Sequence, residues 1–257
     1  MNNIHPTAII ADGAQIAENV EIGPYTTIGP HVTIGKGTRI MPHVVIDGHT
    51  TLGEECHIFP FASLGTQTQD LKFKGDETSV EIGDRTSIRE YVTVNSGTSE
   101  GEVTRVGSDC LLMACSHVAH ACNVGNGVIM ANYSGLAGDV TVEDQAIIAA
   151  MSGVHQFARV GRLCMVGGMS KSVKDCPPYM LVDGNPAKVH GINSIGLRRR
   201  GMGADALRRL KAAFHILYRM DLSTKDALKA IRDEVETAPE IDHLLDFIEA
   251  SERGILK

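Results

Sequence analysis

Side chains suited to proton transfer occur together between residues 117 and 156. They are His117, His120, Asp139, His155 and Gln156. A neutral imidazole is the usual general base near pH 7, and a neighbouring carboxylate can hold its ring in place. These residue types indicate removal of a proton from a nucleophile. His120 and Gln156 are 36 positions apart, so they can act together only if the fold stacks distant segments.

A repeat with a period of six predicts such stacking. An aliphatic residue or methionine occupies 25 of the 28 repeat positions from Ile4 to Val166. The exceptions, Asp70, Asp76 and Glu100, fall in polar insertions. This period is typical of a hexapeptide parallel β-helix, in which three hexapeptides form one triangular coil. Residues 18 positions apart should therefore lie in one column.

The columns predict a pocket. His120 should lie beneath Gly138, and Gly138 beneath Gln156. Asp139 should stack on Ala121 in the adjacent column. His117 and His155 belong to the same region of the surface. Together they form a group in which an imidazole, a carboxylate and an amide converge.

The cysteines fit the repeat rather than a metal site. Four positions after most repeat residues the side chain is small, and most of the six cysteines occupy that position. These are Cys56, Cys110, Cys122, Cys164 and Cys176. Cysteine behaves there as a compact core residue. No CxxC pair is present, so we expect no metal and no cofactor.

Composition limits the class of partner. The formal net charge of −7 argues against nucleic acid. No run of 18 apolar residues predicts a membrane span, and the N-terminal segment MNNIHPTAII lacks the pattern of a signal peptide. We therefore expect a cytoplasmic protein. The basic segment 198–211 favours contact with phosphate or an acidic protein.

The chain divides into two predicted domains. A mainly β fold, the β-helix, should occupy residues 1–191, and a C-terminal helical domain residues 192–257. Polar insertions at about 66–79 and 99–105 should project from the β-helix as loops.

Two further local patterns carry predictions. Helical spacing predicts helices over 204–220, 224–236 and 241–251, with Ser223 capping the second. Glycine directly follows several repeat positions, where we expect it to permit conformations that other residues resist. These glycines are Gly23, Gly29, Gly35, Gly53 and Gly65.

The sequence resembles the UDP-N-acetylglucosamine O-acyltransferases that begin lipid A synthesis, over essentially its whole length. The motifs that carry the resemblance are IHPTAII, IGPYTTIGPHV, QDLKFKG, IGDRTSIRE, HVAHAC, VHQF, MVGG, DGNPA and LRRRG. The resemblance implies a left-handed β-helix and a homotrimer with active sites between subunits. It implies transfer of a 3-hydroxyacyl group from acyl carrier protein to the 3-hydroxyl of UDP-GlcNAc, without a cofactor.

The resemblance also implies residue roles. His120 would be the general base, and the backbone N–H of Gly138 would hold the thioester oxyanion. The residues that would bind the sugar and the nucleotide are Gln69, Asp70, Lys72, His117, His155, Gln156, Asn193, Arg199 and Arg200. Gly168 matches the position that sets acyl chain length, and glycine there implies a long chain, with Met169 adjacent.

Two positions depart from the family pattern. Members usually have Asp after the catalytic His, where this chain has Ala121. They usually have His after LAG, where this chain has Asp139. Because positions 121 and 139 stack, we hypothesise that Asp139 orients His120. An altered sugar pocket also leaves open a 3-amino acceptor, which would give an amide.

Two rival functions remain open at this point. His117, His120 and His155 would suit a zinc enzyme of the carbonic anhydrase type on the same scaffold. A different hexapeptide acyltransferase, with another donor or another sugar, would share the repeat.

Overall fold

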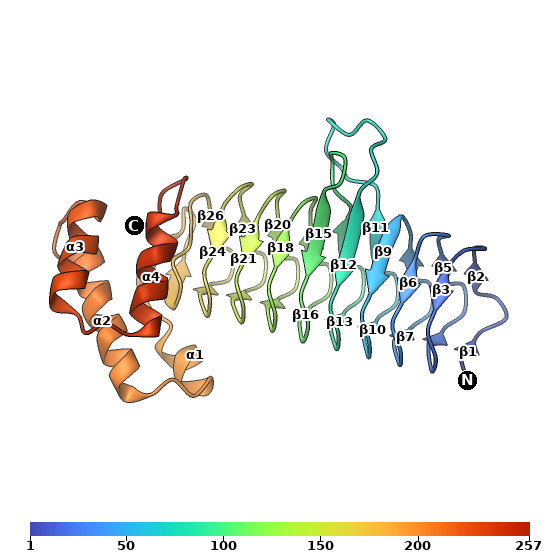
Figure 1. Ribbon diagram of the computed structural model, residues 1–257, viewed down its shortest axis with the longest axis horizontal. Coiled ribbons are helices and arrows are strands. Elements are labelled where there is room, and N and C mark those ends of the chain that lie inside the picture. The colour runs from blue at the N-terminus through green and yellow to red at the C-terminus, as the bar shows by residue number, and fades with distance from the viewer.

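The six-residue repeat folds into short strands, and each of them ends close to its repeat residue. The computed structural model describes all residues, 1–257. Its strands form three sheets, parallel except for the last pair of the first sheet, that make the sides of a long triangular prism, with the helices at the C-terminal end (Figure 1). The prism is a left-handed parallel β-helix, which confirms the predicted fold class.

The strands alternate among the three sheets in chain order. The first sheet contains β1 (Asn3–Ile4), β4 (Glu21–Ile22), β7 (Arg39–Ile40), β10 (His57–Ile58), β13 (Ser87–Ile88), β16 (Leu111–Leu112), β19 (Ile129–Met130), β22 (Ile147–Ile148), β25 (Met165–Val166), β27 (Met180–Asp183) and β28 (Lys188–Ile192). The second contains β2 (Ile9–Ile10), β5 (Thr27–Ile28), β8 (Val45–Ile46), β11 (Ser63–Thr66), β14 (Thr93–Asn95), β17 (His117–Val118), β20 (Gly135–Leu136), β23 (Gly153–Val154) and β26 (Lys171–Ser172). The third contains β3 (Gln15–Ile16), β6 (Thr33–Ile34), β9 (His49–Leu52), β12 (Ser79–Ile82), β15 (Val103–Val106), β18 (Asn123–Val124), β21 (Thr141–Val142) and β24 (Arg159–Val160). We name the edges between them the first–second, second–third and third–first corners.

The register confirms the predicted stacking. Val118 pairs with Leu136, which pairs with Val154, so residues 18 positions apart are neighbours. Where an insertion intervenes the spacing grows, as between Val94 and Val118, and the pairing is kept. The columns inferred from the sequence are therefore real columns of the prism.

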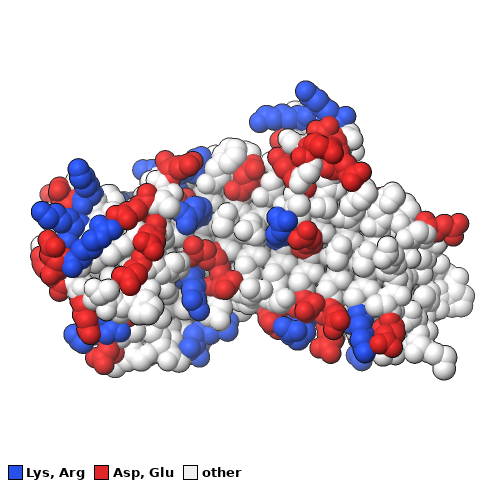
Figure 2. All heavy atoms as spheres, in the orientation of Figure 1, with Lys and Arg blue, Asp and Glu red and all other residues white.

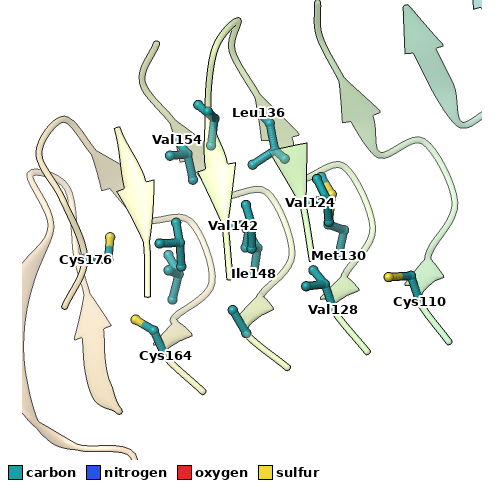
Figure 3. Close-up of a cluster of buried hydrophobic side chains, with 14 of the residues drawn as sticks. Cys110, Val124, Val128, Met130, Leu136, Val142, Ile148, Val154, Cys164 and Cys176 are labelled. Carbon is teal, nitrogen blue, oxygen red and sulfur yellow. The ribbon is translucent and has the colours of Figure 1, made fainter. Parts of the chain in front are cut away.

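The repeat residues fill the interior. From Ile22 to Val166 every aliphatic or methionine repeat residue is at most 3% exposed. Ile4 is exposed because the first coil has no coil beneath it. Figure 3 shows part of this core, with Val124, Met130, Leu136, Val142, Ile148 and Val154 between the sheets. The five cysteines assigned to the core are buried, and only Cys115 is partly exposed.

The glycines that follow the repeat residues do not play the predicted conformational role at the corners. The left-handed conformation falls three positions after the repeat residue, usually on a residue with a side chain, as at His43 (φ 60°) and Phe61 (φ 65°). Among the glycines singled out, only Gly65 has a positive φ. Gly35 is required for another reason: a Cβ there would lie 2.4 Å from the backbone of Gly53 in the next coil. The other three are crowded in the same way.

Both insertions leave the prism at the second–third corner and project side by side (Figure 1). The first lies between β11 and β12, as predicted. The second covers residues 96–102, earlier than the predicted 99–105, because residues 103–105 pair with β12 in strand β15. Backbone hydrogen bonds from Gly101 to Glu77 and from Ser79 to Glu102 join the two loops.

The helical segment follows an antiparallel pair, β27 and β28, that closes the prism. Its helices are α1 (Ser194–Arg199), α2 (Ala204–Arg219), α3 (Thr224–Glu234) and α4 (Pro239–Glu249). The sequence predicted α2 to α4 and missed α1. Ser223 caps α3 by accepting from the N–H of Asp226, as expected. None of these helices has the length and apolar character needed to cross a membrane.

Candidate active site

His120 lies at the second–third corner, in the turn between β17 and β18. Its side chain is 13% exposed. Its ring packs against Gly138 in the next coil, where a Cβ would lie only 2.1 Å from Cε1 of the imidazole. The space that the ring occupies therefore exists only because residue 138 is glycine.

Two carboxylates flank this imidazole, one at each nitrogen. Oδ2 of Asp70 is 3.7 Å from Nε2, and Oδ2 of Asp139 is 3.9 Å from Nδ1. Gln156, one coil further on, donates from Nε2 to the same oxygen of Asp139 at 3.0 Å. The predicted column thus brings His120, Asp139 and Gln156 together, and the first insertion adds Asp70.

Asp70 is held by its own loop and by the second insertion. The N–H of Lys72 donates to its carboxylate at 3.0 Å, and this bond is the main cause that lowers the pKa of Asp70. The hydroxyl of Thr98 donates to Oδ2 at 3.4 Å. Gln69 donates in turn to Asn95, which is buried and donates back to the start of the loop. Asn95, at the end of β14, and Thr98, in the second insertion, were not predicted, because nothing in the sequence distinguishes them from other polar residues near the loops.

His117 lies on the outer side of the second sheet, three residues before His120. Its Nδ1 is 2.7 Å from the hydroxyl of Thr93 in the coil beneath. Burial lowers the pKa of His117, and the neighbouring His120 lowers it further. His117 is therefore neutral near pH 7 and offers one N–H and one lone pair. The hydroxyl of Thr93 bonds to Nδ1 of His117 and so decides which nitrogen of the ring carries the proton. Thr93 was not predicted from the sequence.

His155 occupies the expected column but faces solvent. It is exposed, and its Nδ1 is 3.1 Å from the carbonyl oxygen of Gln156. The three histidines do not form a group that could hold a metal ion, nor does any other set of three or more His, Cys, Asp or Glu residues.

The remaining predicted residues lie at the other two corners of the prism. Asn193 abuts the third–first corner, where it donates to the carbonyl of Leu163 at 3.0 Å and caps α1 through Gly196. Arg199 and Arg200 are exposed at the end of that helix. The residues assigned to chain length, Gly168 and Met169, are exposed at the first–second corner. One chain alone does not bring these five residues to His120.

The geometry around His120 fits acid–base chemistry beside an anion site. Each nitrogen faces a carboxylate at a distance longer than a hydrogen bond, so a hydroxyl placed between Nε2 and Asp70 can give its proton to Nε2. The backbone N–H of Gly138 donates to no acceptor in the chain. A backbone N–H beside a base can stabilise an oxyanion as it forms.

Comparison with known families matches both parts of the chain. Residues 3–36 match the family described as "Bacterial transferase hexapeptide (six repeats)". Residues 175–256 match the one described as "Udp N-acetylglucosamine O-acyltransferase; Domain 2".

Individual relatives agree with these matches. The chain is similar to the acyl-[acyl-carrier-protein]--UDP-N-acetylglucosamine O-acyltransferase of Burkholderia orbicola, with 48% identity over 262 residues that cover 100% of both proteins. A protein of the same name from Synechocystis is 48% identical over 194 residues, or 76% of this chain and 70% of that protein. Among solved structures, a UDP-N-acetylglucosamine acyltransferase from Bacteroides fragilis has a TM-score of 0.97 at 44% identity, covering 99% of this chain and 100% of that one.

Proposed function

Because the chain belongs to the UDP-N-acetylglucosamine O-acyltransferase family, we propose that it moves a 3-hydroxyacyl group from acyl carrier protein to the 3-position of UDP-GlcNAc, in lipid A synthesis. The observation that carries this proposal is the group formed by His120, Gly138 and the two flanking carboxylates. It supplies a base and an oxyanion donor at one place. The expected cytoplasmic location goes with these two substrates and stays a proposal.

The reaction needs only groups that the chain carries. Nε2 of His120 takes the proton of the sugar hydroxyl as its oxygen attacks the thioester carbon. The Gly138 N–H donates to the oxygen that becomes negative. As the tetrahedral intermediate collapses, the carbon–sulfur bond breaks and the proton passes from His120 to the departing thiolate. Asp139 holds the imidazole through Nδ1.

The sugar would be held by the first insertion. Asp70 is ionised, and its carboxylate lies 3.7 Å from Nε2 of His120. A sugar hydroxyl placed between the two groups can donate its proton to Nε2 while it lies beside the carboxylate of Asp70. Lys72 and Gln69 stand beside it on the same loop. His117 and Gln156 would contact the sugar from the neighbouring coils.

An exposed apolar edge supports the proposed homotrimer. Large apolar residues follow the first–second corner and are 46–71% exposed: Tyr25, Phe61, Tyr91, Tyr133, Met151 and Met169. The rings of Tyr25, His43, Phe61 and Tyr91 stack on one another with centroids 4.9–5.2 Å apart. A continuous patch of this kind is typical of a surface that another chain covers.

Three copies packed with these edges at a shared axis would cover the patch. The first sheet of one subunit, with its half-buried outward residues Leu111, Ile129 and Ile147, would then face the second sheet of the next. On the outer face of that second sheet, Gly135 and Gly153 have no side chain and leave open space. This packing sets the second–third corner of one subunit against the third–first corner of its neighbour. Arg199 and Arg200 would then lie opposite His120 of another subunit.

Breaking this edge is expected to separate the subunits. Phe61→Glu places a charge in the middle of the ring stack, where association would have to bury it. Light scattering should give three times 27.6 kDa for the wild-type protein and a smaller mass for the variant. Activity should fall with the mass, because each site needs a neighbour. A variant that keeps the wild-type mass and rate would contradict this interface, and Lys229→Glu on α3 serves as a charged surface control.

The basic segment 198–211 is proposed to contact the acidic carrier protein. Its net positive charge is smaller than the sequence suggests, because two of its arginines pair with carboxylates. Arg208 pairs with Asp205, and Arg209 with Glu240. Charges of both signs therefore cover the helical end, whereas the face of the prism shown in Figure 2 is largely uncharged. Arg198 and Lys211 remain exposed and without an ion-pair partner for an acidic surface.

The space at Gly168 supports a long acyl chain. A Cβ there would meet only the carbonyl oxygen of Ala150, at 3.4 Å, and the residue is exposed. In the proposed trimer this corner borders the groove between subunits. A larger residue would shorten the groove.

One assay separates the proposed function from its rivals. Purified protein is incubated with acyl carrier proteins of different 3-hydroxyacyl length, or with acyl-coenzyme A, and with UDP-GlcNAc or its 3-amino analogue. We expect an ester at the 3-position with a long carrier-bound chain. If only the 3-amino analogue is acylated, and an amide forms, the acceptor is the 3-amino sugar in place of UDP-GlcNAc. Transfer only from coenzyme A, or stoichiometric zinc with hydratase activity, would overturn the proposal.

The orienting role of Asp139 has its own test. Asp139→Asn keeps the size of the side chain but removes the charge at Nδ1 of His120. We expect kcat to fall about 10- to 100-fold, less than in a fully buried triad, because the 3.9 Å pair is partly exposed. The measurement is kcat across the pH range, with Asp233→Asn on α3 as control. A wild-type profile for Asp139→Asn would mean that Asp139 does not orient the base.

A further inference from the structure

The second insertion reaches the candidate active site at Thr98. The hydroxyl of Thr98 lies 3.4 Å from Oδ2 of Asp70, the carboxylate oxygen that faces Nε2 of His120 at 3.7 Å. The other oxygen, Oδ1, accepts from the backbone N–H of Lys72 in the first insertion. The two oxygens of Asp70 are therefore held from two different loops, and the oxygen beside the imidazole is the one that Thr98 contacts.

Three hydrogen bonds close a ring around this contact. The N–H of Asp70 donates to the hydroxyl oxygen of Thr68 at 3.1 Å, and the hydroxyl oxygens of Thr68 and Thr98 are 3.4 Å apart. The backbone N–H of Lys72 is the main cause that lowers the pKa of Asp70, so the carboxylate is ionised at neutral pH and can only accept. The proton of Thr98 therefore points to Oδ2 of Asp70, and the proton of Thr68 points to the oxygen of Thr98.

Burial makes this ring resistant to rearrangement. The side chains of Thr68 and Thr98 belong to residues that are only 5% and 6% exposed. A hydroxyl buried without a partner costs free energy, because no water replaces the lost hydrogen bond. Neither insertion can shift relative to the other without leaving one of these hydroxyls unpaired.

Glu102 holds Thr98 in its place within the second insertion. Oε2 of Glu102 accepts from the N–H of Thr98 at 2.8 Å and from the N–H of Ser99 at 3.2 Å, which closes the loop on itself. Gly97 makes room for this contact, because a Cβ there would lie 2.5 Å from Cβ of Glu102. The second insertion therefore presents the Thr98 hydroxyl to Asp70 at a fixed position.

We propose that Thr98 is a positioning residue for the acceptor sugar, which sets the rotation of the Asp70 carboxylate and keeps Oδ2 beside Nε2 of His120. The inference rests on the proposed function, which assigns Asp70 to the sugar. An aspartate carboxylate without such a partner rotates over a broad range of angles. A carboxylate that is already fixed loses no rotational freedom when the sugar binds, so the affinity for the sugar is higher.

Kinetics of two substitutions at position 98 test this role. Thr98→Val keeps the shape of the side chain and removes the hydroxyl, whereas Thr98→Ser keeps the hydroxyl. We expect Thr98→Val to raise KM for UDP-GlcNAc about tenfold, as loss of a hydrogen bond to a charged group predicts, and to leave kcat and KM for acyl carrier protein near their wild-type values. Thr98→Ser should restore KM for UDP-GlcNAc. Thr51→Val, at an exposed position of β9, is the matched control.

A merely structural role for Thr98 predicts a different result. A fraction of the protein would then be inactive, so kcat would fall while KM for UDP-GlcNAc stayed the same. That result would overturn the proposal, and so would wild-type kinetics in Thr98→Val. A Thr98→Ser protein as impaired as Thr98→Val would also overturn it, because the hydroxyl would then not be the cause.

Titration of Asp70 tests the ring without substrate. Carbon-13 NMR of labelled aspartate carboxyl groups follows the titration, and Asp70→Asn identifies the signal. Thr98→Val should raise the pKa of Asp70, because a donor to the ionised form is lost. The charged groups that face Asp70, Lys72 and His120, are the same in both proteins.

The titration also separates this inference from the proposed function. An unchanged pKa of Asp70 in Thr98→Val would overturn the ring. A wild-type protein that transfers no acyl group to UDP-GlcNAc would contradict the proposed function. If the pKa of Asp70 still rose in Thr98→Val, the control of this carboxylate by Thr98 would stand.

Discussion

Replacing His120 with alanine is expected to lower kcat by about 10²- to 10⁴-fold, the range that a positioned general base contributes. His120 is the imidazole that packs against Gly138, with Nε2 3.7 Å from Oδ2 of Asp70. Without it the hydroxyl must lose its proton to water as it attacks. The KM values should change little, because the loops that hold the substrates do not depend on the imidazole. The measurement is steady-state kinetics with the carrier-bound donor.

The control for this variant is His215→Ala on α2, which removes an exposed imidazole far from the corner. Thermal unfolding and light scattering should show that His120→Ala keeps its fold and its assembly. The imidazole of His120 belongs neither to the hydrophobic core nor to the apolar edge at the first–second corner, so neither the fold nor the assembly should depend on it. If correctly assembled His120→Ala transferred acyl groups at the wild-type rate, the mechanism would be wrong.

The prism could be predicted from the sequence because one period fixes three things at once. The six-residue spacing sets which side chain points inward, how long a strand is and which residues stack. The proximity of Gln156 to Asp139 follows from this spacing alone, although they are 17 positions apart. Few folds allow a side-chain contact to be derived by counting.

The insertions could not be predicted in the same way, because they have no period. The bond from Thr98 to Asp70 joins two loops whose paths depend on each other. Asn95 likewise received no role, although it is buried beneath the first loop. Polar residues in a loop look alike in a sequence, so only the structure separates those that hold Asp70 from those that face solvent.

Helix α1 was missed for a different reason. It has only six residues, contains Gly196 and has too few apolar positions to show a period. Its stability comes from contact with the prism, where Asn193 bonds to Leu163 and caps the helix. Both ends of the Asn193 amide are thus engaged within the chain. A role for Asn193 in binding the nucleotide would have to act through the position of α1, which ends at the two arginines.

The glycine at 138 links the fold to the chemistry, and Gly138→Ala should have an effect almost as large as the loss of His120. The added Cβ would lie 2.1 Å from Cε1 and 2.2 Å from Nε2 of the imidazole. The ring must move, and it then loses its place between Asp70 and Asp139. We expect kcat to fall about 10²- to 10³-fold, within the range that a positioned general base contributes, because alanine keeps the N–H at position 138 and only the placement of the imidazole is lost. Gly191→Ala, where a Cβ has open space, is the matched control.

A double variant shows whether the clash is the cause. In the presence of His120, Gly138→Ala should reduce the free energy of unfolding by about 1–3 kcal/mol, as overpacking does. In the His120→Ala background the same methyl group has room, so the cost should vanish while activity stays low. The coupling between the two substitutions measures the contact itself. Additive effects on stability would show that position 138 is glycine for a reason other than the imidazole beside it.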